Sequence, residues 1–319
     1  MSYAPLKQRL DAGETLILDG ATGTELQRRG AKMDATAWSA PVVLDDPQLL
    51  TEIHADYIRA GADIVTANTF SASRMLLAPG GYGDRVEEII RRSVEVAQQA
   101  RTLAAAGRPV AVAGSISHMV PVVQGANRTD PTRLPSDAEI GESVDELAQT
   151  LKKSGADLII LEMMNRPNRI KLALKAALAT GLPVWYGMSA RAGKDGRALS
   201  FDSTVDAPLE PIISLIPASG VDVAGFMHTN AEIMLEALKP LRAVFKGPLM
   251  AYPDSGYFEM PEWRFVDVIT PERLERFFLD WLEAGVQVIG GCCGLTAEHI
   301  EAAVSARNKF KKALQLAAT

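Results

Sequence analysis

The 319-residue sequence predicts an α/β protein, a (β/α)8 TIM barrel formed by a single domain. Eight short apolar runs alternate with eight longer amphipathic stretches, which is the rhythm of repeated βα units. Most of the runs are continuously apolar, as is typical of parallel strands covered on both faces. Several stretches end in Gly just before the next run, where Gly supplies the left-handed residue that closes a helix. A doubly wound open sheet is the alternative, but no G-x-G-x-x-G turn follows the first run, which favours the barrel.

The predicted elements cover most of the chain. The eight strands are expected at 16–19, 63–67, 109–114, 157–161, 183–187, 222–226, 248–252 and 286–290. The eight helices are expected at 47–60, 85–106, 138–154, 167–179, 204–217, 231–241, 271–284 and 297–314. Related corners, AGAD, SGAD, SGVD and AGVQ, recur where strands begin and indicate one supersecondary unit used repeatedly. Three long connections, 115–137, 188–203 and 253–270, follow strands, so we expect them at the C-terminal mouth, where substrates bind.

The composition argues against several classes of partner. A net charge of -6 and an isoelectric point near 5.4 disfavour a nucleic-acid partner, which normally meets a concentrated basic face. No run of about 18 apolar residues could span a bilayer, and residues 1–10 lack an apolar stretch of signal-peptide length. We therefore expect a cytoplasmic protein with no membrane partner. The two cysteines are direct neighbours, Cys292 and Cys293, so they form no disulfide framework and suit a reducing compartment.

The residues that follow the strands of a (β/α)8 barrel converge on one mouth, so these positions are the candidates for chemistry. Going round the barrel, they are Asp19, Asn68, Ser115, Glu162, Ser189, His228, Asp254, Cys292 and Cys293. The second, fourth, sixth and eighth strands share one layer parity, which would point their candidates toward a common centre. One strand intervenes between His228 and Cys292, a span of about 10 Å that two inward side chains can close onto one ion.

The two adjacent cysteines and His228 predict a zinc site. Two thiolates and an imidazole form a soft ligand set that suits Zn²⁺ and leaves the fourth position open for a substrate. Neighbouring strand residues point to opposite faces, so both cysteines reach one ion only where the backbone leaves strand geometry. Gly290, Gly291 and Gly294 provide that freedom. Two alternatives stay open: ordinary buried cysteines beside a hydrogen-bonded histidine, and a vicinal disulfide, which needs a strained ring and an oxidising environment.

Five segments of the chain resemble the homocysteine S-methyltransferase family: LILDGATGTEL, GADIVTANTFSAS, AGSIS, LEMM and WLEAGVQVIGGCCGLTAEHI. The last segment is the most specific, and the match runs from about residue 14 to about residue 306. The family includes betaine-homocysteine and S-methylmethionine-homocysteine methyltransferases and the homocysteine-binding barrel of cobalamin-dependent methionine synthase. The resemblance implies a (β/α)8 barrel whose zinc binds the homocysteine sulfur and delivers it as a thiolate to an activated methyl group.

The resemblance also implies roles for individual residues. The family's acidic residue after the first strand matches Asp19, and its Glu after the fourth strand matches Glu162; both are catalytic candidates that would hold the substrate ammonium group. The backbone amides of residues 21–24 would bind the substrate carboxylate, as turn amides often do for anions. The full set expected to bind substrate is Asp19, Ala21, Thr22, Gly23, Thr24, Asn68, Ser115 and Glu162.

Three segments of the chain depart from the family pattern. The family usually shows Gly-x-Asn-Cys after the sixth strand, but this chain has Gly225-Phe226-Met227-His228, so His replaces the first thiolate and Met replaces Asn. His118 replaces the Pro after the family's Gly-Ser turn, and the expected Asn-Ala-Gly-Glu-like segment reads Asp254-Ser255-Gly256-Tyr257. Imidazole is a good zinc ligand, so the metal can survive the change. The site with two thiolates is neutral, however, so a bound substrate thiolate is expected to be less electron-rich.

The leading hypothesis is transfer of a methyl group to homocysteine, giving methionine, from a small onium donor such as S-methylmethionine, S-adenosylmethionine or a betaine. One alternative is a stand-alone acceptor barrel that takes its methyl group from a methylcorrinoid protein. The other is a methyltransferase for a different thiol, or a non-catalytic metal-binding barrel, that arose with the His228 replacement.

Aromatic residues near the strand ends could form a cation–π box for an onium donor, with plain loop packing as the alternative. They are Trp38, Phe70, Tyr252, Tyr257, Phe258 and Trp263. Among the remaining histidines, His54 and His299 are interpreted as helix-face residues. His118 is interpreted as a surface residue of a long loop, with contact to the donor as the alternative.

Overall fold

The computed structural model describes residues 2–121, 129–202, 205–259 and 264–317. At its centre is an eight-stranded parallel sheet whose strands follow the order β1-β12-β9-β8-β5-β4-β3-β2. Their bounds are β1 Leu16–Ile17, β2 Ile64–Ala67, β3 Ala111–Ser117, β4 Leu158–Met164, β5 Val184–Met188, β8 Val221–Asn230, β9 Leu249–Asp254 and β12 Val286–Ile289. A parallel bridge from Leu18 to Ile64 joins the two ends of this order. The predicted (β/α)8 barrel is therefore confirmed, and every predicted strand overlaps an observed one.

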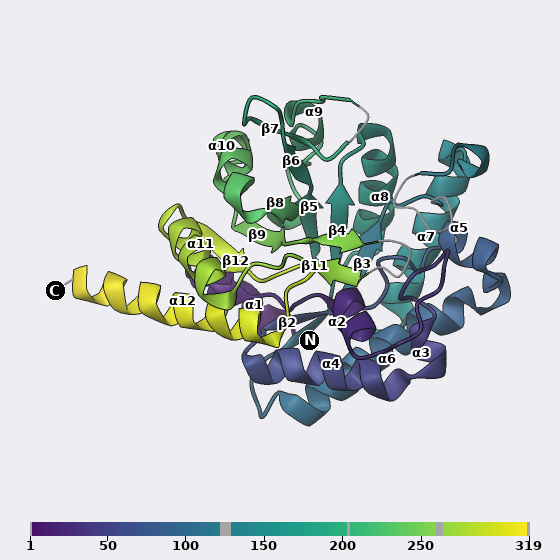
Figure 1. Cartoon of the computed structure of the whole chain (residues 1–319), viewed down its shortest axis with the longest axis horizontal. Helices are drawn as coiled ribbons and strands as arrows, with labels where there is room; N and C mark the ends of the chain where they lie inside the picture. The colour runs from purple at the N-terminus through teal and green to yellow at the C-terminus, as the bar shows by residue number, and fades with distance from the viewer. Residues whose placement is uncertain (1, 122–128, 203–204, 260–263, 318–319) are drawn as a thin grey trace.

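Helices surround the strands (Figure 1), and seven of them match predicted helices. These seven are α4 Pro47–Ala60, α6 Val86–Ala104, α7 Asp137–Lys153, α8 Pro167–Ala179, α10 Met234–Val244, α11 Pro271–Glu283 and α12 Ala297–Ala317. The helix predicted at 204–217 is wrong, because among the described residues of that range only α9, Glu210–Ile213, is α-helical. Pro208 and Pro217 bracket this short helix, and a proline disfavours helical geometry in the residue before it.

Several short elements were not predicted. Four helices lie outside the barrel repeat: α1 Ala4–Asp11, α2 Thr22–Arg28, α3 Val42–Asp45 and α5 Arg74–Leu77. Two long connections contain antiparallel hairpins, in which β6 (Ala190–Ala192) pairs with β7 (Ala198–Ser200) and β10 (Tyr257–Glu259) pairs with β11 (Arg264–Val266). Both hairpins follow barrel strands, so they belong to the mouth where the long connections were expected.

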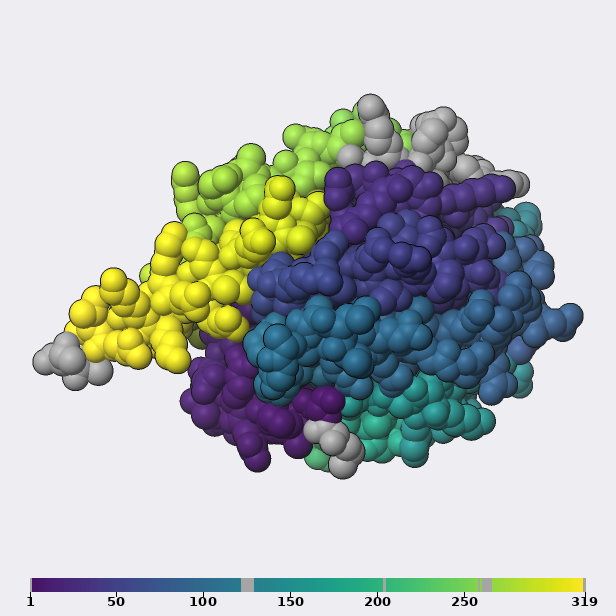
Figure 2. Space-filling view, turned by 90° about the horizontal axis from the view of Figure 1, so that it is seen from below, coloured from purple at the N-terminus to yellow at the C-terminus, as the bar shows by residue number. Residues whose placement is uncertain are grey.

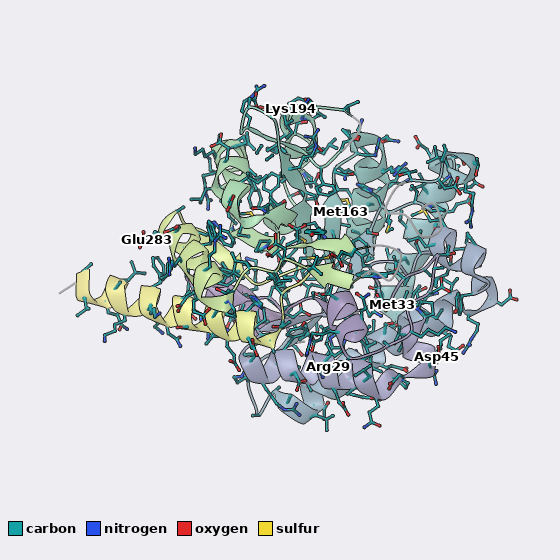
Figure 3. The ribbon with its side chains drawn as sticks, in the orientation of Figure 1. Arg29, Met33, Asp45, Met163, Lys194 and Glu283 are labelled. Atoms are coloured by element: carbon teal, nitrogen blue, oxygen red, sulfur yellow. The ribbon has the colours of Figure 1, made fainter. Side chains whose placement is uncertain are left out.

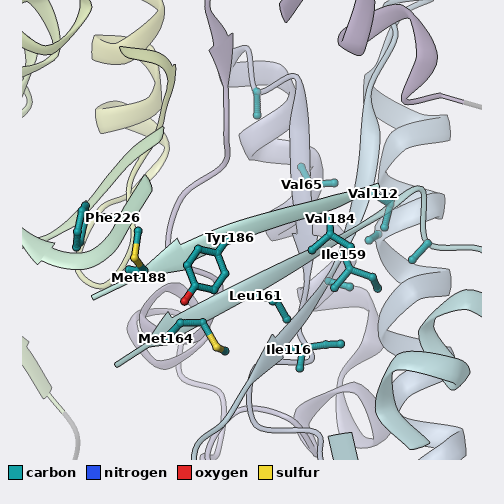
Figure 4. Close-up of a cluster of buried hydrophobic side chains, with 14 of the residues drawn as sticks. Val65, Val112, Ile116, Ile159, Leu161, Met164, Val184, Tyr186, Met188 and Phe226 are labelled. Carbon is teal, nitrogen blue, oxygen red and sulfur yellow. The ribbon is translucent and has the colours of Figure 1, made fainter. Parts of the chain in front are cut away.

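The two faces of each strand pack into different cores. In β4, Ile159 and Leu161 belong to the large cluster between sheet and helices, part of which Figure 4 shows. Leu158 and Ile160 belong to a second cluster, in which strand residues and the start of the chain pack together inside the barrel. This alternation is the period of two expected of a strand. It decides which residues at the strand ends face the interior, where the candidate site lies.

The N-terminal segment closes the end of the barrel opposite the mouth. Tyr3, Leu6 and Leu10 of this segment are buried within the inner core. The Tyr3 hydroxyl donates to Oδ2 of Asp222 (2.8 Å) and accepts from Nε1 of Trp185 (2.9 Å). Because the Trp185 ring is fully buried, this hydroxyl satisfies a donor that would otherwise lie unpaired inside the barrel.

The recurring Asp of the GAD-type corners ties the strand starts to neighbouring segments. Asp63 accepts from the guanidinium of Arg9 (2.8 Å) and from the backbone amide of Ile17 (2.9 Å). Asp157 accepts from Arg101 (2.6 Å) and from the amide of Val112 (2.9 Å). The repeat noticed in the sequence therefore has a structural explanation: a carboxylate at the start of a strand binds the neighbouring strand's backbone.

Helix α12 extends beyond the body of the molecule (Figures 1 and 2). Residues Ala303 and Ala306 are buried against the body, whereas every described residue from Lys311 onward is exposed. No helix in the described part of the chain is long and apolar enough to cross a membrane.

His54 on α4 gives the protein an acid-sensitive core position. Its side chain is fully buried, and neither ring nitrogen has a hydrogen-bond partner among the described residues. Burial lowers its pKa to about 4, below the value near 6.5 of an unfolded histidine. Between these two pKa values the unfolded chain binds a proton at His54 and the folded chain does not. The contribution of neutral His54 to the free energy of unfolding is therefore complete above about pH 6.5 and is lost as the pH falls toward 4.

We expect unfolding by urea to show this loss as a slope of about 1.4 kcal/mol per pH unit, or about 3 kcal/mol in all, between pH 6.5 and 4. Comparison with His54→Leu isolates the effect, because other titrating groups are common to both proteins. Identical pH profiles for the two proteins would show that His54 is not the group responsible.

Candidate metal centre

Cys292 and Cys293 lie in the loop that follows β12, at the mouth of the barrel. The amide of Cys292 donates to the carbonyl of Pro253 (2.7 Å), and the carbonyl of Cys293 accepts from the amide of Ser255 (3.1 Å). Both partners belong to the segment at the end of β9, the neighbouring strand in the sheet. Backbone bonds to an adjacent strand therefore fix the path of the cysteine loop.

Three glycines allow the loop to follow this path. A Cβ on Gly290 would lie 2.5 Å from the carbonyl oxygen of Leu18, and a Cβ on Gly291 would lie 2.5 Å from the Leu295 side chain. Gly294 has φ = 82°, in the left-handed region that other residues avoid. The predicted need for glycine is thus confirmed, although close approach explains the first two and backbone conformation explains the third.

His228 reaches the interior through an irregularity in β8. The inner core contains Val223 and Met227, so regular alternation points Met227 inward and His228 outward. His228 instead has φ = 46°, and the pairing of β8 with β9 shifts register between Met227 and Asn230. A residue other than glycine in this region is strained, which commonly marks a functional position. The layer parity expected for His228 was therefore wrong, and the bulge is what turns its ring inward.

Met227, which stands where the family usually has Asn, fills the barrel beneath this site. It is fully buried in the inner core together with Tyr252 and Cys292. A Cβ on Gly187 would lie 2.1 Å from the Met227 sulfur, so the glycine of β5 leaves room for that side chain. The floor of the site is therefore apolar where the family pattern would place an amide.

The three predicted ligands converge. The Sγ atoms of Cys292 and Cys293 are 3.8 Å apart, and they lie 3.3 Å and 3.9 Å respectively from Nδ1 of His228. Tetrahedral zinc, with bonds of about 2.3 Å to sulfur and about 2.0 Å to nitrogen, separates two sulfurs by about 3.8 Å and a sulfur from a nitrogen by about 3.6 Å. The donor atoms thus already have the spacing of one face of a zinc tetrahedron, and all lie within 4.8 Å of one another.

The same distances decide against a vicinal disulfide. A disulfide requires an S–S separation of about 2.05 Å, whereas both cysteines are free and their sulfurs are 3.8 Å apart. Both sulfurs also lie within 3.9 Å of Nδ1 of His228, a convergence that ordinary buried cysteines beside a hydrogen-bonded histidine do not require.

Burial and mutual hydrogen bonds shift the pKa values of the three candidate ligands. Burial lowers the pKa of His228, but hydrogen bonds to Cys293 and Glu162 outweigh burial and raise it to about 10. The hydrogen bond with Cys292, and then the one with His228, lower the pKa of Cys293 to about 5. Burial raises the pKa of Cys292 well above its ordinary value, and burial likewise raises that of the adjacent Asp254 to about 6. Cys293 is therefore the more readily ionised of the two thiols, and a metal would compete with protons for these side chains.

Glu162 lies against Nε2 of the histidine ring, which is also 3.4 Å from Cys292 Sγ. Its Oε2 is 3.3 Å from Nε2 of His228, and the residue is 6% exposed. The next residue, Met163, which Figure 3 labels near the centre of the view, has φ = 58°. The register between β4 and β5 shifts at this point. Glu162 follows the inward parity of Leu158 and Ile160, so its position agrees with the prediction.

Asp19 is enclosed in the barrel wall. It is completely buried, and its carboxylate accepts from the amide (2.6 Å) and hydroxyl (3.0 Å) of Thr66 and from the hydroxyl of Tyr252 (3.3 Å). Burial raises its pKa to about 8, although the bonds from Thr66 act in the opposite direction. Thr66 and Tyr252 were not predicted as partners of Asp19. Their inward-facing positions in β2 and β9 are the pattern in the sequence that could have indicated them. Glu162 offers the more accessible of the two carboxylates.

The amides of residues 21–24 are not equivalent. The Ala21 amide donates to the carbonyl of Leu295 (2.9 Å), so it is not available to a substrate carboxylate as the sequence suggested. Thr22, Gly23 and Thr24 form the first turn of α2, whose amides have no acceptor within the helix. Only these three of the four expected donors remain.

Asn68 and Ser115, the other expected substrate-binding residues, are both buried. The side-chain amide of Asn68 accepts from the hydroxyl of Ser39 and donates to the carbonyl of Ser39, both at 2.8 Å. These two bonds hold the 30–41 connection in place. Ser115 has the inward parity of Ala111 and Ala113. Its hydroxyl has no partner in the described part of the chain.

The surface position predicted for His118 is wrong, whereas the helix-face position predicted for His299 is confirmed. His118 is buried rather than at the surface, and its Nε2 accepts from the amide of Asn165 (3.1 Å). Burial lowers its pKa to about 3, assisted by the nearby Arg169. His299 does lie on a helix face, as expected, but on the buried face of α12, where its Nε2 contacts the carbonyl of Ile269 at 2.8 Å.

Aromatic side chains border the ligand cluster on one side. The Phe70 ring lies 5.4 Å from the His228 ring, and the Trp38 ring meets Phe70 edge-on at 6.4 Å. A Cβ on Gly23 would lie 2.2 Å from the Trp38 ring, so glycine at the start of α2 lets the indole pack there. Tyr252 binds Asp19 instead, and Tyr257 is 56% exposed. The predicted Trp263 and the side chain of Phe258 lie outside what the structure describes.

Fold and site together define a (β/α)8 barrel with a candidate thiolate–imidazole metal centre at the carboxyl ends of its strands. The sequence model of the family described as homocysteine S-methyltransferase matches residues 16–307. The chain belongs to this family, as the motifs around the cysteine pair predicted.

Similar proteins span almost the entire chain. A homocysteine S-methyltransferase of Escherichia coli K12 is 31% identical and covers 95% of this chain and 98% of its own. A selenocysteine Se-methyltransferase of Brassica oleracea is 28% identical, with coverage of 94% and 91%. The crystal structure of the homocysteine methyltransferase MmuM from Escherichia coli in its metallated form aligns with a TM-score of 0.74 at 25% identity, covering 96% of this chain and 99% of that one.

Proposed function

We propose that this protein is a zinc-dependent methyltransferase that moves a methyl group from a small onium donor to the thiolate of homocysteine, forming methionine. The observation that carries the proposal is the spacing of the three donor atoms, which matches one face of a zinc tetrahedron. A similar protein is named a homocysteine S-methyltransferase, and a similar structure is of a metallated homocysteine methyltransferase. His228, Cys292 and Cys293 would hold the ion.

Zinc would supply ionisation of the substrate thiol, which is otherwise only slightly deprotonated at neutral pH. The sulfur lone pair then forms the new S–C bond while the bond from the methyl carbon to the onium atom breaks, and the donor leaves without its positive charge. The buried, apolar floor around Met227 excludes water from the thiolate. Exclusion of water keeps the sulfur nucleophilic.

The remaining residues would orient the two substrates. Glu162 would bind the homocysteine ammonium group, and Asp19 would accept from that group through a carboxyl oxygen within the wall. The amides of Thr22, Gly23 and Thr24 would receive the carboxylate. Phe70, beside the ligand cluster, would place an aromatic face against the positive charge of the donor, where a cation–π contact contributes about 0.5–2 kcal/mol.

A donor panel tests the proposal. Protein reconstituted with zinc is incubated with homocysteine and, separately, S-methylmethionine, S-adenosylmethionine, a betaine or methylcobalamin, and methionine is measured by mass spectrometry. We expect methionine with at least one onium donor. Product with methylcobalamin alone would favour the corrinoid-dependent alternative. Stoichiometric zinc with no product from any donor would reject homocysteine methylation, and repeating the panel with selenocysteine would test the acceptor suggested by the Brassica relative.

A further inference from the structure

Glu162 contacts Nε2 of His228, the ring nitrogen that lies 3.4 Å from Cys292 Sγ, whereas Nδ1 is the nitrogen that contacts Cys293. Nδ1 of His228 lies within 3.9 Å of both sulfurs, whereas Nε2 lies 3.3 Å from Oε2 of Glu162. We propose that Glu162 is a positioning residue for the metal ligand: its Oε2 accepts the Nε2 proton, which fixes the tautomer of His228 that leaves Nδ1, the nitrogen within reach of both sulfurs, free to bind the ion. This inference rests on the proposed metal centre and adds a task to a residue so far assigned only to the substrate.

The chemistry of a histidine ligand requires such a partner. A neutral imidazole has one donor and one acceptor nitrogen, and the hydrogen bond made by one nitrogen decides which form is present. Carboxylates commonly play this part behind a metal-bound histidine, where they also raise its basicity. A cysteine side chain has no ring nitrogen and needs no such partner. A residue that fixes the tautomer is required here because His228 occupies the place of the usual thiolate.

The contact also compensates for the missing charge. Two thiolates neutralise Zn²⁺, whereas three would leave one negative charge. The Glu162 carboxylate, hydrogen-bonded to the ligand itself, returns that negative charge to the immediate surroundings of the ion. Both side chains are nearly enclosed, with exposures of 11% for His228 and 8% for Glu162, so water screens the interaction little. The substrate thiolate should therefore stay more electron-rich than the count of thiolates alone predicts.

Two backbone irregularities bring the pair together. Met163 and His228 both have positive φ, and each stands where a strand of the barrel shifts register against its neighbour. One irregularity turns His228 inward, and the other follows Glu162 directly. Positive φ is strained at residues other than glycine, so the surrounding barrel must enforce it.

Glu162 can perform both tasks because its two oxygens are differently placed. Oε2 faces the ring, whereas the described residues provide no hydrogen bond to Oε1. Oε1 therefore remains for the substrate ammonium group. The two tasks can be separated experimentally, since metal binding requires no substrate.

The test is a double-mutant cycle on metal affinity. Zinc affinity is measured by competition with a chelator for the unmodified protein, Glu162→Ala, His228→Cys and the double variant. Loss of an outer-shell partner typically lowers metal affinity about 10–100-fold, and we expect this for Glu162→Ala in the presence of His228. In the His228→Cys background the same substitution should change affinity less than about threefold, because no imidazole remains to be oriented. Equal effects in both backgrounds would overturn the inference.

Three further measurements guard against misfolding and against a purely structural role. Glu162→Gln preserves shape and an acceptor oxygen but not the charge, so we expect a smaller loss of affinity than for Glu162→Ala. Asp19→Asn alters a carboxylate that does not contact His228 and should leave zinc affinity unchanged. In cadmium-113-loaded protein labelled with ¹⁵N-histidine, coupling should appear at Nδ1 with a protonated Nε2. Coupling at Nε2 would contradict the assignment.

The outcomes distinguish this inference from the proposed function. If Glu162→Ala abolishes methyl transfer but leaves zinc affinity and ¹⁵N coupling unchanged, Glu162 serves only the substrate, and the inference alone is wrong. If the unmodified protein binds no zinc, both the inference and the zinc-dependent function are wrong.

Discussion

Replacing Cys293 with serine is expected to lower zinc affinity by more than about 100-fold and to abolish zinc-dependent methyl transfer. Loss of a residue that only supports a ligand lowers metal affinity by up to about 100-fold, and loss of a ligand itself should have a larger effect. Cys293 is the thiol whose pKa is lowered to about 5, by the hydrogen bond with Cys292 first and His228 next, so it is the more readily ionised of the two cysteines. Serine keeps the size of the side chain but not the thiolate, which is the form that binds metal. Metal content after dialysis and methionine formation are the two readouts.

The matched control for this variant is His299→Gln. His299 is a buried histidine of α12 that contacts the Ile269 carbonyl and lies outside the ligand cluster. Its replacement should leave stoichiometric zinc in place. His228→Ala should behave like Cys293→Ser if it is the third ligand. Full zinc content in either ligand variant would refute the assignment of that residue.

Replacing Gly225 with alanine is expected to destabilise the protein by at least about 3 kcal/mol, near the upper end of overpacking effects. A Cβ at Gly225 would lie 1.9 Å from the carbonyl oxygen of Met250 and 2.6 Å from its carbonyl carbon. These atoms belong to the backbone of β9, so relief requires β8 and β9 to separate. Because the same strands carry His228 and the carbonyl that holds Cys292, zinc binding should weaken together with stability. The free energy of unfolding in urea and the zinc affinity measure both effects.

Gly141→Ala provides the contrasting substitution. Gly141 lies within α7, and a Cβ there would meet only the Leu172 side chain, at an ordinary contact distance of 3.6 Å. Alanine in a helix interior is favoured over glycine by about 0.8–1.0 kcal/mol, so we expect a small gain in stability. A loss comparable to that of Gly225→Ala would show that space around the glycine does not govern the effect.

The barrel could be predicted because each strand is an apolar run covered on both faces, and that pattern depends only on local sequence. The helix expected at 204–217 does not form over that range, although the apolar spacing suits a helix. Pro208 and Pro217 disfavour helical geometry in the residues before them. The hairpins β6–β7 and β10–β11 were not predicted because their strands are only three residues long. Such short segments carry too little periodicity to be recognised.

The candidate ligands could be predicted from residue types, but their geometry could not. Alternation places Met227 inside and His228 outside, and the bulge that reverses this leaves no mark in the sequence. The Ala21 amide was expected to face the substrate, but it donates a hydrogen bond to the carbonyl of Leu295, 274 positions later in the chain. Contacts between distant segments decided these outcomes. Local patterns do not encode such contacts, and the same reason accounts for the burial of His118.

The backbone bonds of the cysteine loop also bear on how the protein would respond to a chelator. The Cys292 amide, the Cys293 carbonyl and the Gly294 amide each bind a different residue: Pro253, Ser255 and Thr24. None of these bonds passes through a metal ion, so we expect the loop to keep its path when the ion is removed, unlike small domains that fold only around zinc. Metal removal should thus be reversible, and the gain in stability on reloading should follow mass action alone, about 2.7 kcal/mol when free zinc reaches a hundred times Kd.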